Sequence, residues 1–355
     1  MSSEFVRALK GICIIAVVFG QEKGKDMDTS TFRPYEELSY GPLDPKVSLE
    51  PDFFSDFVAE RRAEIVEREA SFYRKITEPY SVSDQIDTSW TSFTSSDGVE
   101  IPIKCYRPRS AAPSDSLPCV MFFHGGGWKT CSVETHDYVP SYLAAHAQVM
   151  CLSVEYRLAP EHKFPCGLED CYAACMWASS HASELGLDHS RMVVAGDSSG
   201  GNFAAVVAQM AQKRGNFSLT GQVLIYPVCD LEDLVVQKRS PGIYGPLRGE
   251  DLGPSPLACD YLSCPEEQVK DPRFAPLLAE DLSGLPPALF ILAECDSLVD
   301  DGLYYAQRLV NAGVDVKVRV WQGMPHAFIL RTYEETFEAL ETIAAWLKER
   351  FFSLS

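Results

Sequence analysis

From about residue 90 onward, short apolar runs alternate with longer stretches in which apolar residues recur at helical spacing. An uninterrupted apolar run suits a strand buried on both faces, and strands that alternate with helices predict an α/β fold with a mostly parallel central sheet. The expected strands are 90–94, 101–107, 119–123, 149–154, 192–195, 222–225, 288–292 and 316–320. The expected helices are 138–147, 167–183, 200–213, 302–312 and 332–350.

Two regions depart from this alternation. The first precedes the sheet: residues 1–39 form an N-terminal extension, and residues 40–85 contain an amphipathic pattern that predicts a helix over 51–76. The second is a Pro- and Gly-rich stretch at about 230–274, and a long insertion after a strand is typical of a lid or a binding loop. We therefore expect the catalytic domain to span 86–355 and to contain this insertion.

The extreme N-terminus bears on location. Arg7 and Lys10 precede an apolar run from Gly11 to Gly20, which weakly matches a signal peptide. The run is about half the roughly 20 residues that span a bilayer, so we expect no membrane anchor. The 12 cysteines include many in apolar strand-like runs, where cysteine acts as a small hydrophobic residue. The sequence favours a reducing, cytoplasmic location, and the alternative is secretion if residues 1–20 act as a signal.

The charge balance limits the partners. Fifty acidic against 31 basic residues give a net charge of −19. Such a surface repels phosphate backbones and anionic membranes, so the expected partner is a small molecule and not nucleic acid or membrane. Three cysteines cluster on an expected helix, at 166, 171 and 175, without the spacing of a zinc site, so no metal is expected. The oligomeric state stays open, a dimer included.

The strongest chemical signal is Gly196-Asp197-Ser198-Ser199-Gly200, between an expected strand and an expected helix. A nucleophile on such a sharp turn has a strained backbone and needs small neighbours. The turn presents the hydroxyl above the sheet at a helix N-terminus, where backbone N–H groups favour negative charge. We therefore expect Ser198 to be the nucleophile and the N–H of Ser199 to contribute to an oxyanion hole.

A second signal, His124-Gly125-Gly126-Gly127-Trp128, follows the strand expected at 119–123. Backbone N–H groups of consecutive glycines can stabilise a tetrahedral oxyanion. We expect Gly126 and Gly127, with Gly125 as a further candidate, to be such donors. The alternatives are a flexible turn and a phosphate loop. The pattern Gly127-Trp128-Lys129-Thr130 lacks the glycine that a phosphate loop has immediately before its lysine.

The third signal is an acid and a histidine after two successive late strands. Asp296 follows the strand at 288–292 and His326 follows the strand at 316–320, which gives the order Ser, Asp, His of an α/β hydrolase. Asp300 and Asp301 are competing acids, but they begin the next helix, where acids favour the helix dipole. The remaining histidines are expected on helices or surface loops, at 136, 146, 162, 181 and 189.

Together these motifs resemble the hormone-sensitive-lipase-like esterases, a group that includes the arylacetamide deacetylases, over roughly residues 85–350. The glycine loop is similar to that group's HGGG signature, and 196–202 is similar to its GDSAGGN elbow, with Ser199 in place of alanine. A further characteristic stretch begins at Tyr156-Arg157 and includes Glu169-Asp170. The resemblance implies an α/β-hydrolase fold with a helical cap, supplied here by residues 40–80 and part of 230–270.

The function expected from these residues is acyl-ester hydrolysis. Ser198 would form an acyl-enzyme, with His326 as base and Asp296 orienting it, and no cofactor is required. Short to medium acyl chains are expected from the resemblance alone. Two alternatives stay open: an amidase or arylacetamide-type deacetylase that uses the same triad, and a non-catalytic small-molecule receptor, because a fold does not fix function. Receptors such as those for gibberellin lack the catalytic histidine.

Overall fold

The computed structural model describes residues 12–13, 41–47, 61–231, 240 and 260–352. The strands are β1 (Ile12–Cys13), β2 (Ile86–Thr94), β3 (Glu100–Pro108), β4 (Leu117–Phe123), β5 (Met150–Val154), β6 (Leu187–Asp197), β7 (Gly221–Ile225), β8 (Ala288–Cys295) and β9 (Val316–Pro325). The α-helices are α2 (Arg62–Thr77), α3 (Tyr138–Ala147), α4 (Cys166–Ser180), α5 (Ala182–Leu185), α6 (Ser199–Arg214), α9 (Pro265–Gln268), α10 (Val299–Asn311) and α11 (Glu334–Phe352). Short 3₁₀ helices are η3 (Glu78–Tyr80), η5 (Pro276–Leu278) and η6 (Phe328–Leu330).

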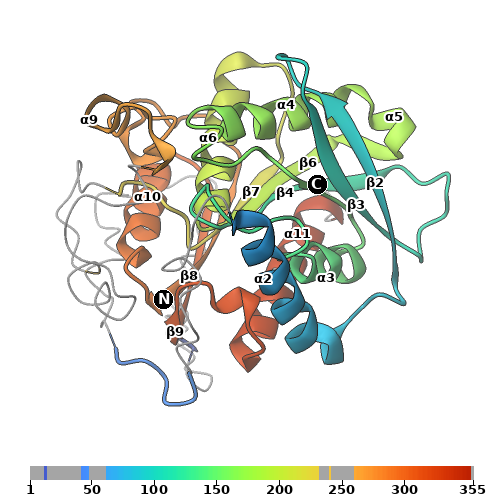
Figure 1. Ribbon diagram of the computed structural model, residues 1–355, viewed down its shortest axis with the longest axis horizontal. Helices are drawn as coiled ribbons and strands as arrows, with labels where there is room; N and C mark the ends of the chain where they lie inside the picture. The colour runs from blue at the N-terminus through green and yellow to red at the C-terminus, as the bar shows by residue number, and fades with distance from the viewer. Residues whose placement is uncertain (1–11, 14–40, 48–60, 232–239, 241–259, 353–355) are drawn as a thin grey trace, which may run out of the picture.

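The described strands form one sheet in the order β1-β9-β8-β7-β6-β4-β5-β3-β2. The six strands β9, β8, β7, β6, β4 and β5 pair in parallel in this order. Strand β1 joins one end antiparallel, and β3 and then β2 join the other end antiparallel. Figure 1 shows the strongly twisted sheet crossing the molecule. The carboxyl ends of β4, β6, β8 and β9 therefore meet along one edge, and the segments that follow them can share one site.

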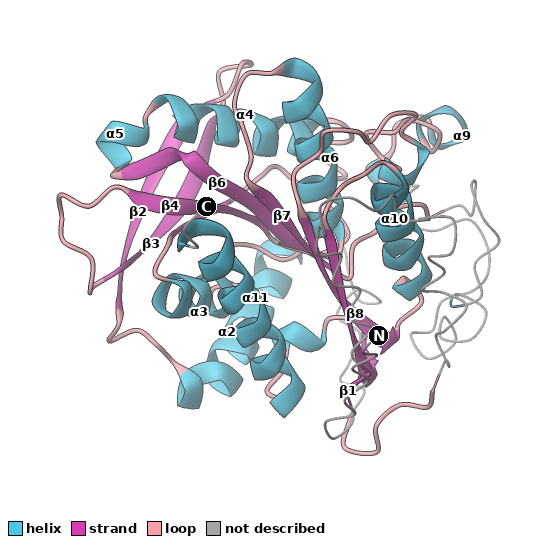
Figure 2. Ribbon diagram, turned by 180° about the vertical axis from the view of Figure 1, so that it is seen from behind, coloured by secondary structure: helices cyan, strands magenta, loops and turns pink. Residues whose placement is uncertain are grey.

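Helices cover both faces of the sheet. Figure 2 shows α3 and α11 on one face and α4, α6 and α10 on the other. Successive side chains of a strand point to opposite faces, so a central strand is buried on both faces and is mostly apolar. In β4, Met121 packs in the core under α4 and α6, whereas Phe122 packs in the core under α3 and α11. This double burial explains the uninterrupted apolar runs in the sequence.

The expected elements lie where the sequence places them, although several bounds differ: β2, for example, begins at Ile86 and β9 ends at Pro325. The expected helix 167–183 is divided into α4 and α5 at His181, whose backbone leaves the helical region with φ −104° and ψ 17°. Strand β6 begins five residues before the expected 192, in a polar stretch without strand alternation. Strand β1 was not expected, and it pairs with β9.

The expected cap region is described in part. Helix α2 begins at Arg62, and the expected helical residues 51–60 lie outside the described residues, as do 232–239 and 241–259 of the expected insertion. Helix α2 lies against the glycine-loop region: Arg62 Nε donates to the carbonyl oxygen of Lys129 at 3.0 Å. The extended segment 41–47 contacts β9: the N–H of Asp44 donates to the carbonyl oxygen of Gly323 at 3.0 Å.

Candidate active site

Ser198 occupies the sharp turn between β6 and α6. Its backbone has φ 54° and ψ −119°, a conformation that non-glycine residues rarely adopt and that is characteristic of strained functional positions. The flanking glycines are required by space. A Cβ at Gly196 would lie 2.3 Å from the carbonyl oxygen of Gly200, and one at Gly200 would lie 2.0 Å from the carbonyl oxygen of Phe123. The spacing of the motif therefore follows from close backbone approaches around the serine.

Three side chains from distant parts of the chain meet at this turn. His326 Nε2 lies 2.9 Å from Ser198 Oγ, and His326 Nδ1 lies 2.6 Å from Asp296 Oδ2. The carboxylate of Asp296 is fully buried directly after β8, and its other oxygen accepts the N–H of Leu298 at 2.9 Å. With Nδ1–H donating to Asp296, Nε2 is left to accept the serine proton, which is the arrangement that a general base needs.

The two competing acids have structural roles. Asp300 and Asp301 lie buried in the first turn of α10, as the sequence indicates. Asp301 Oδ2 accepts the N–H groups of Cys229 and Asp230 at 2.6 and 2.8 Å. Asp300 Oδ2 accepts the N–H of Ser240 at 2.9 Å. Both carboxylates therefore fix the segment that follows β7, and neither is the acid within hydrogen-bond distance of His326.

The glycine loop lies beside the serine. Its backbone passes through positive φ at Gly126 (117°) and Gly127 (57°), and Trp128 N–H donates to Ser199 Oγ at 3.3 Å. The N–H of Ser199 belongs to the first turn of α6 and so has no partner within the helix. The N–H of Gly125 donates to Asp197 Oδ1 at 2.8 Å. The interpretation of Gly125 as an oxyanion donor is therefore wrong, because that N–H is already bonded.

His124 has a structural role next to the loop. Its ring is fully buried and stacks on Tyr156 with ring centroids 4.3 Å apart, while the Tyr156 hydroxyl donates to the His124 carbonyl oxygen at 2.6 Å. Burial, with the nearby His136, lowers the pKa of His124 to about 3. The ring is neutral near pH 7, and its Nδ1 lies 2.7 Å from the Gly125 carbonyl oxygen.

The sequence analysis missed two contributors to the site and one ion pair beyond it. Asp197 connects the serine turn to the glycine loop, and His136, expected on a helix or surface loop, is instead buried against Asp197. Arg157 binds Asp170 through two parallel hydrogen bonds of 2.8 and 2.7 Å, which ties the loop after β5 to α4. Asp197 could have been suspected from its place in the elbow motif, whereas nothing near His136 in the sequence points to it.

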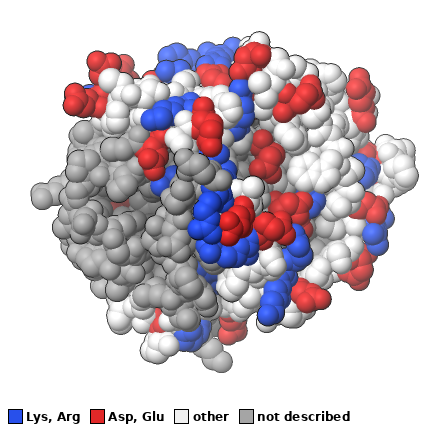
Figure 3. Space-filling view, viewed as in Figure 1, with Lys and Arg blue, Asp and Glu red and all other residues white. Residues whose placement is uncertain are grey.

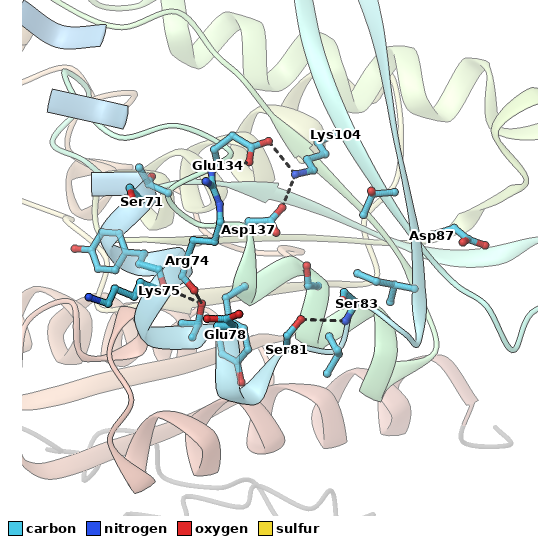
Figure 4. A pocket seen from close by; sticks show the side chains of 18 of the residues that line it. Ser71, Arg74, Lys75, Glu78, Ser81, Ser83, Asp87, Lys104, Glu134 and Asp137 are labelled. Atoms are coloured by element: carbon cyan, nitrogen blue, oxygen red, sulfur yellow. Dashed lines mark hydrogen bonds and ion pairs between the residues drawn. The ribbon is translucent and has the colours of Figure 1, made fainter. Parts of the chain in front are cut away.

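A cavity of about 710 Å³ lies between the α2–η3 segment and the β2–β3 pair (Figure 4). Its wall carries Lys104, whose Nζ lies 2.8 Å from Glu134 Oε1 and 2.6 Å from Asp137 Oδ1. Ser198, Asp296 and His326 are not among the residues that line it. The cavity is thus separate from the triad, although its wall includes the segment that precedes α3.

The comparisons with known proteins agree with this geometry. The class that the fold and site define is that of the α/β hydrolases with a Ser-His-Asp triad. A family model described as the α/β hydrolase fold matches residues 120–330. The chain therefore belongs to this α/β-hydrolase family.

Individual relatives are ester hydrolases by name. The chain is 41% identical to a carboxylesterase, NlhH, of Mycobacterium tuberculosis over 232 residues, which cover 65% of this chain and 72% of the relative. It is 35% identical to an ethyl acetate hydrolase of Pseudomonas putida, over 88% of this chain and 94% of that protein. Among solved structures, a hyperthermophilic esterase from Pyrobaculum calidifontis superposes with a TM-score of 0.77 at 35% identity, over 87% of this chain and 99% of the other.

Charge and hydropathy of the described part add two observations. Figure 3 shows Lys and Arg side chains beside Asp and Glu side chains across the described part of one face. Of the helices within the described residues, none combines the length and the apolar composition that crossing a bilayer requires.

Proposed function

We propose that this carboxylic ester hydrolase cleaves acyl esters of short to medium chain length through an acyl-enzyme on Ser198. The hydrogen-bonded series Ser198–His326–Asp296, with distances of 2.9 and 2.6 Å, carries the proposal. Support for small acyl groups comes from a relative named ethyl acetate hydrolase, and a relative named arylesterase supports ester substrates. The receptor alternative is disfavoured because His326 is present and its Nε2 is within hydrogen-bond distance of the serine hydroxyl.

The proposed reaction has two steps. His326 removes the proton from Ser198 as the oxygen attacks the ester carbonyl, and Asp296 holds the ring and stabilises its positive charge. The N–H groups of Gly126, Gly127 and Ser199 stabilise the oxyanion. His326 then returns its proton to the departing alcohol. Water, deprotonated by the same ring, hydrolyses the acyl-enzyme and restores the serine.

Substitution of the serine tests the assignment. We expect Ser198→Ala to lower kcat/KM for 4-nitrophenyl butyrate by about 10⁴- to 10⁶-fold, because the nucleophile is removed while the binding groups remain. The same variant should no longer gain the mass of a phosphonyl group after treatment with a fluorophosphonate. Ser199→Ala is the matched control, because position 199 contributes its backbone N–H and should keep most of the activity. Undiminished activity in Ser198→Ala would refute the proposal.

The acyl preference requires a separate measurement. We expect kcat/KM over a series of 4-nitrophenyl esters from acetate to palmitate to be highest at about C2 to C8, because one relative is named for the hydrolysis of ethyl acetate. A matched acyl anilide distinguishes the amidase alternative. Turnover of the anilide that equals turnover of the ester would favour a deacetylase, and a maximum at palmitate would contradict the chain-length proposal.

A further inference from the structure

A group of buried polar side chains lies behind the glycine loop and takes no part in the proposed reaction. It includes Glu69 from α2, His124 from the loop, His136 from the segment before α3, and Asp197 from the end of β6, each 2% exposed or less. Charges are costly in such a place unless they are paired. The hydrogen bonds that these side chains form therefore indicate which parts of the active site they hold in place.

Asp197 connects the two halves of the active site. It directly precedes Ser198, and its Oδ1 accepts the N–H of Gly125 at 2.8 Å, directly before the proposed oxyanion donors. The same carboxylate oxygen lies 3.2 Å from His136 Nε2. Burial acts to raise the pKa of Asp197, but the charge of His136 and the hydrogen bonds from His136 and Gly125 outweigh it, so the pKa is lowered. The group is thus held as a carboxylate.

Contacts at both nitrogens fix the ring of His136. The Thr135 hydroxyl lies 2.8 Å from the Ser132 carbonyl oxygen and 2.8 Å from His136 Nδ1. On the other side of the ring, Nε2 faces the Asp197 carboxylate, 3.2 Å from Oδ1 and 3.4 Å from Oδ2. The imidazole therefore links the turn at 132–135 to Asp197.

The position of His136 is also fixed from the opposite side. Lys104 binds the flanking residues Glu134 and Asp137 at 2.8 and 2.6 Å, as Figure 4 shows. The Tyr106 hydroxyl donates to Asp137 Oδ1 at 2.9 Å. These contacts hold the chain on both sides of position 136, so the imidazole is held rigidly against Asp197.

We propose that His136 is a positioning residue that holds the oxyanion loop, through Asp197 and the Gly125 N–H, in the geometry that stabilises the transition state. Oxyanion donors act because they are oriented before the charge develops. Without the His136 ring, the buried Asp197 carboxylate loses a hydrogen-bond partner, which favours its reorientation or protonation and loosens its bond to Gly125. The inference rests on the proposed function, since it concerns the same oxyanion.

Two substitutions at His136 test the proposal. His136→Leu removes both ring nitrogens, and we expect kcat for 4-nitrophenyl butyrate to fall by about 10- to 100-fold while KM changes by less than about threefold, since one oxyanion donor is worth about 10²- to 10³-fold in kcat. His136→Gln keeps an N–H donor for Asp197, and kcat should fall less than in His136→Leu. His146→Gln, an exposed position on α3, is the matched control and should retain wild-type kcat.

A transition-state analogue separates positioning from a general loss of structure. A trifluoromethyl ketone forms a tetrahedral adduct with an oxyanion, whereas the corresponding methyl ketone binds mainly as the unreacted carbonyl. We expect affinity for the trifluoromethyl ketone to fall by the same factor as kcat/KM in each variant, with affinity for the methyl ketone unchanged. A folded His136→Leu or His136→Gln series in which kcat and trifluoromethyl ketone affinity stay within twofold of wild type overturns the proposal.

Two further outcomes of these experiments also bear on the proposal. If His136→Leu does not fold, His136→Gln alone decides, because a fall in its kcat and trifluoromethyl ketone affinity supports the proposal and wild-type values overturn it. Equal weakening of both ketones also overturns it, because that pattern marks a distorted pocket. If the wild-type protein hydrolyses no ester and a fluorophosphonate does not label Ser198, the proposed function itself fails. If the wild-type protein is active but substitution at position 136 changes nothing, only the proposal for His136 fails.

Discussion

At the scale of single residues, Gly126 shows how closely the active-site backbone is packed. Its φ of 117° is sterically open to glycine, and a Cβ there would lie 2.2 Å from the carbonyl oxygen of Thr130. The N–H of Thr130 donates to the Gly126 carbonyl oxygen at 3.0 Å, so the loop closes on itself. The proposed oxyanion donors thus lie in a turn that cannot accept a side chain without moving.

Substitution of this glycine should therefore affect both stability and catalysis. We expect Gly126→Ala to lower the free energy of unfolding by more than about 1 kcal/mol and to lower kcat by at least about 10²-fold, because the clash displaces oxyanion donors. Gly313→Ala is the control, since Gly313 also has positive φ (81°) but no atom within 4 Å of a Cβ. Urea unfolding and ester assays measure both quantities, and equal effects of the two substitutions would exclude a role for the clash.

His124 predicts a pH dependence of stability. Its pKa falls from the ordinary 6.5 to about 3 in the folded protein. Between these values the unfolded chain binds a proton that the folded chain does not, so this group makes the free energy of unfolding fall as pH falls. The contribution approaches about 1.4 kcal/mol per pH unit.

Substitution isolates that contribution. Between pH 6 and 4, the free energy of unfolding should fall less steeply with pH in His124→Gln than in wild type. The difference in slope should correspond to at most about one proton taken up on unfolding. Urea titrations at several pH values measure the slope. His189→Gln, at an exposed position, is the control and should keep the wild-type slope. A slope unchanged by His124→Gln would show that this ring does not remain neutral in the folded protein.

At the scale of elements, the contact between the β5–α4 loop and α4 rests on one buried ion pair. Asp170 is 1% exposed and accepts two parallel bonds from Arg157, whereas the adjacent Glu169 pairs with Arg214 near the surface, where the two side chains are 40% and 38% exposed. Both carboxylates lie on α4 and each binds an arginine, so they differ mainly in burial.

The two positions make a matched comparison. Asp170→Asn should lower the free energy of unfolding by about 3 kcal/mol, because removal of one partner leaves a partly buried arginine without its main counter-charge. Glu169→Gln should cost less than about 1 kcal/mol, as is usual for exposed pairs. Chemical unfolding of both variants checks the difference, and similar losses would show that burial does not set the strength of these pairs.

The order of strands and helices could be predicted because each central strand is buried on both faces and its sequence is mostly apolar. The triad could be predicted because Ser198, Asp296 and His326 each follow such a strand directly. By contrast, the start of β6 is polar, and β1 is two residues long, so neither has a periodic signal. The pairing of His136 with Asp197 joins residues 61 positions apart, and only the packing of the segment before α3 against the end of β6 brings them together.

At the scale of the whole molecule, the net charge of −19 should act on charged substrates. An acidic protein repels anions, and this repulsion weakens as salt shortens the Debye length from about 30 Å at 0.01 M to about 8 Å at 0.15 M. We expect kcat/KM for an ester that carries a carboxylate, such as a 4-nitrophenyl hemisuccinate, to rise over this range. A neutral 4-nitrophenyl ester is the control and should change little. An equal response of the two esters would rule out an electrostatic effect.

The wide spacing of the triad along the chain has a consequence for biosynthesis. His326 lies 128 residues after Ser198, and β9, which precedes it, is the last strand to be made. At about 5–20 residues per second, a ribosome needs on the order of 10 s to progress from the serine to the histidine. During that interval the nascent polypeptide carries the proposed nucleophile without the proposed base. Hydrolytic activity therefore arises only late in translation, and its appearance reports that the C-terminal part of the sheet has assembled.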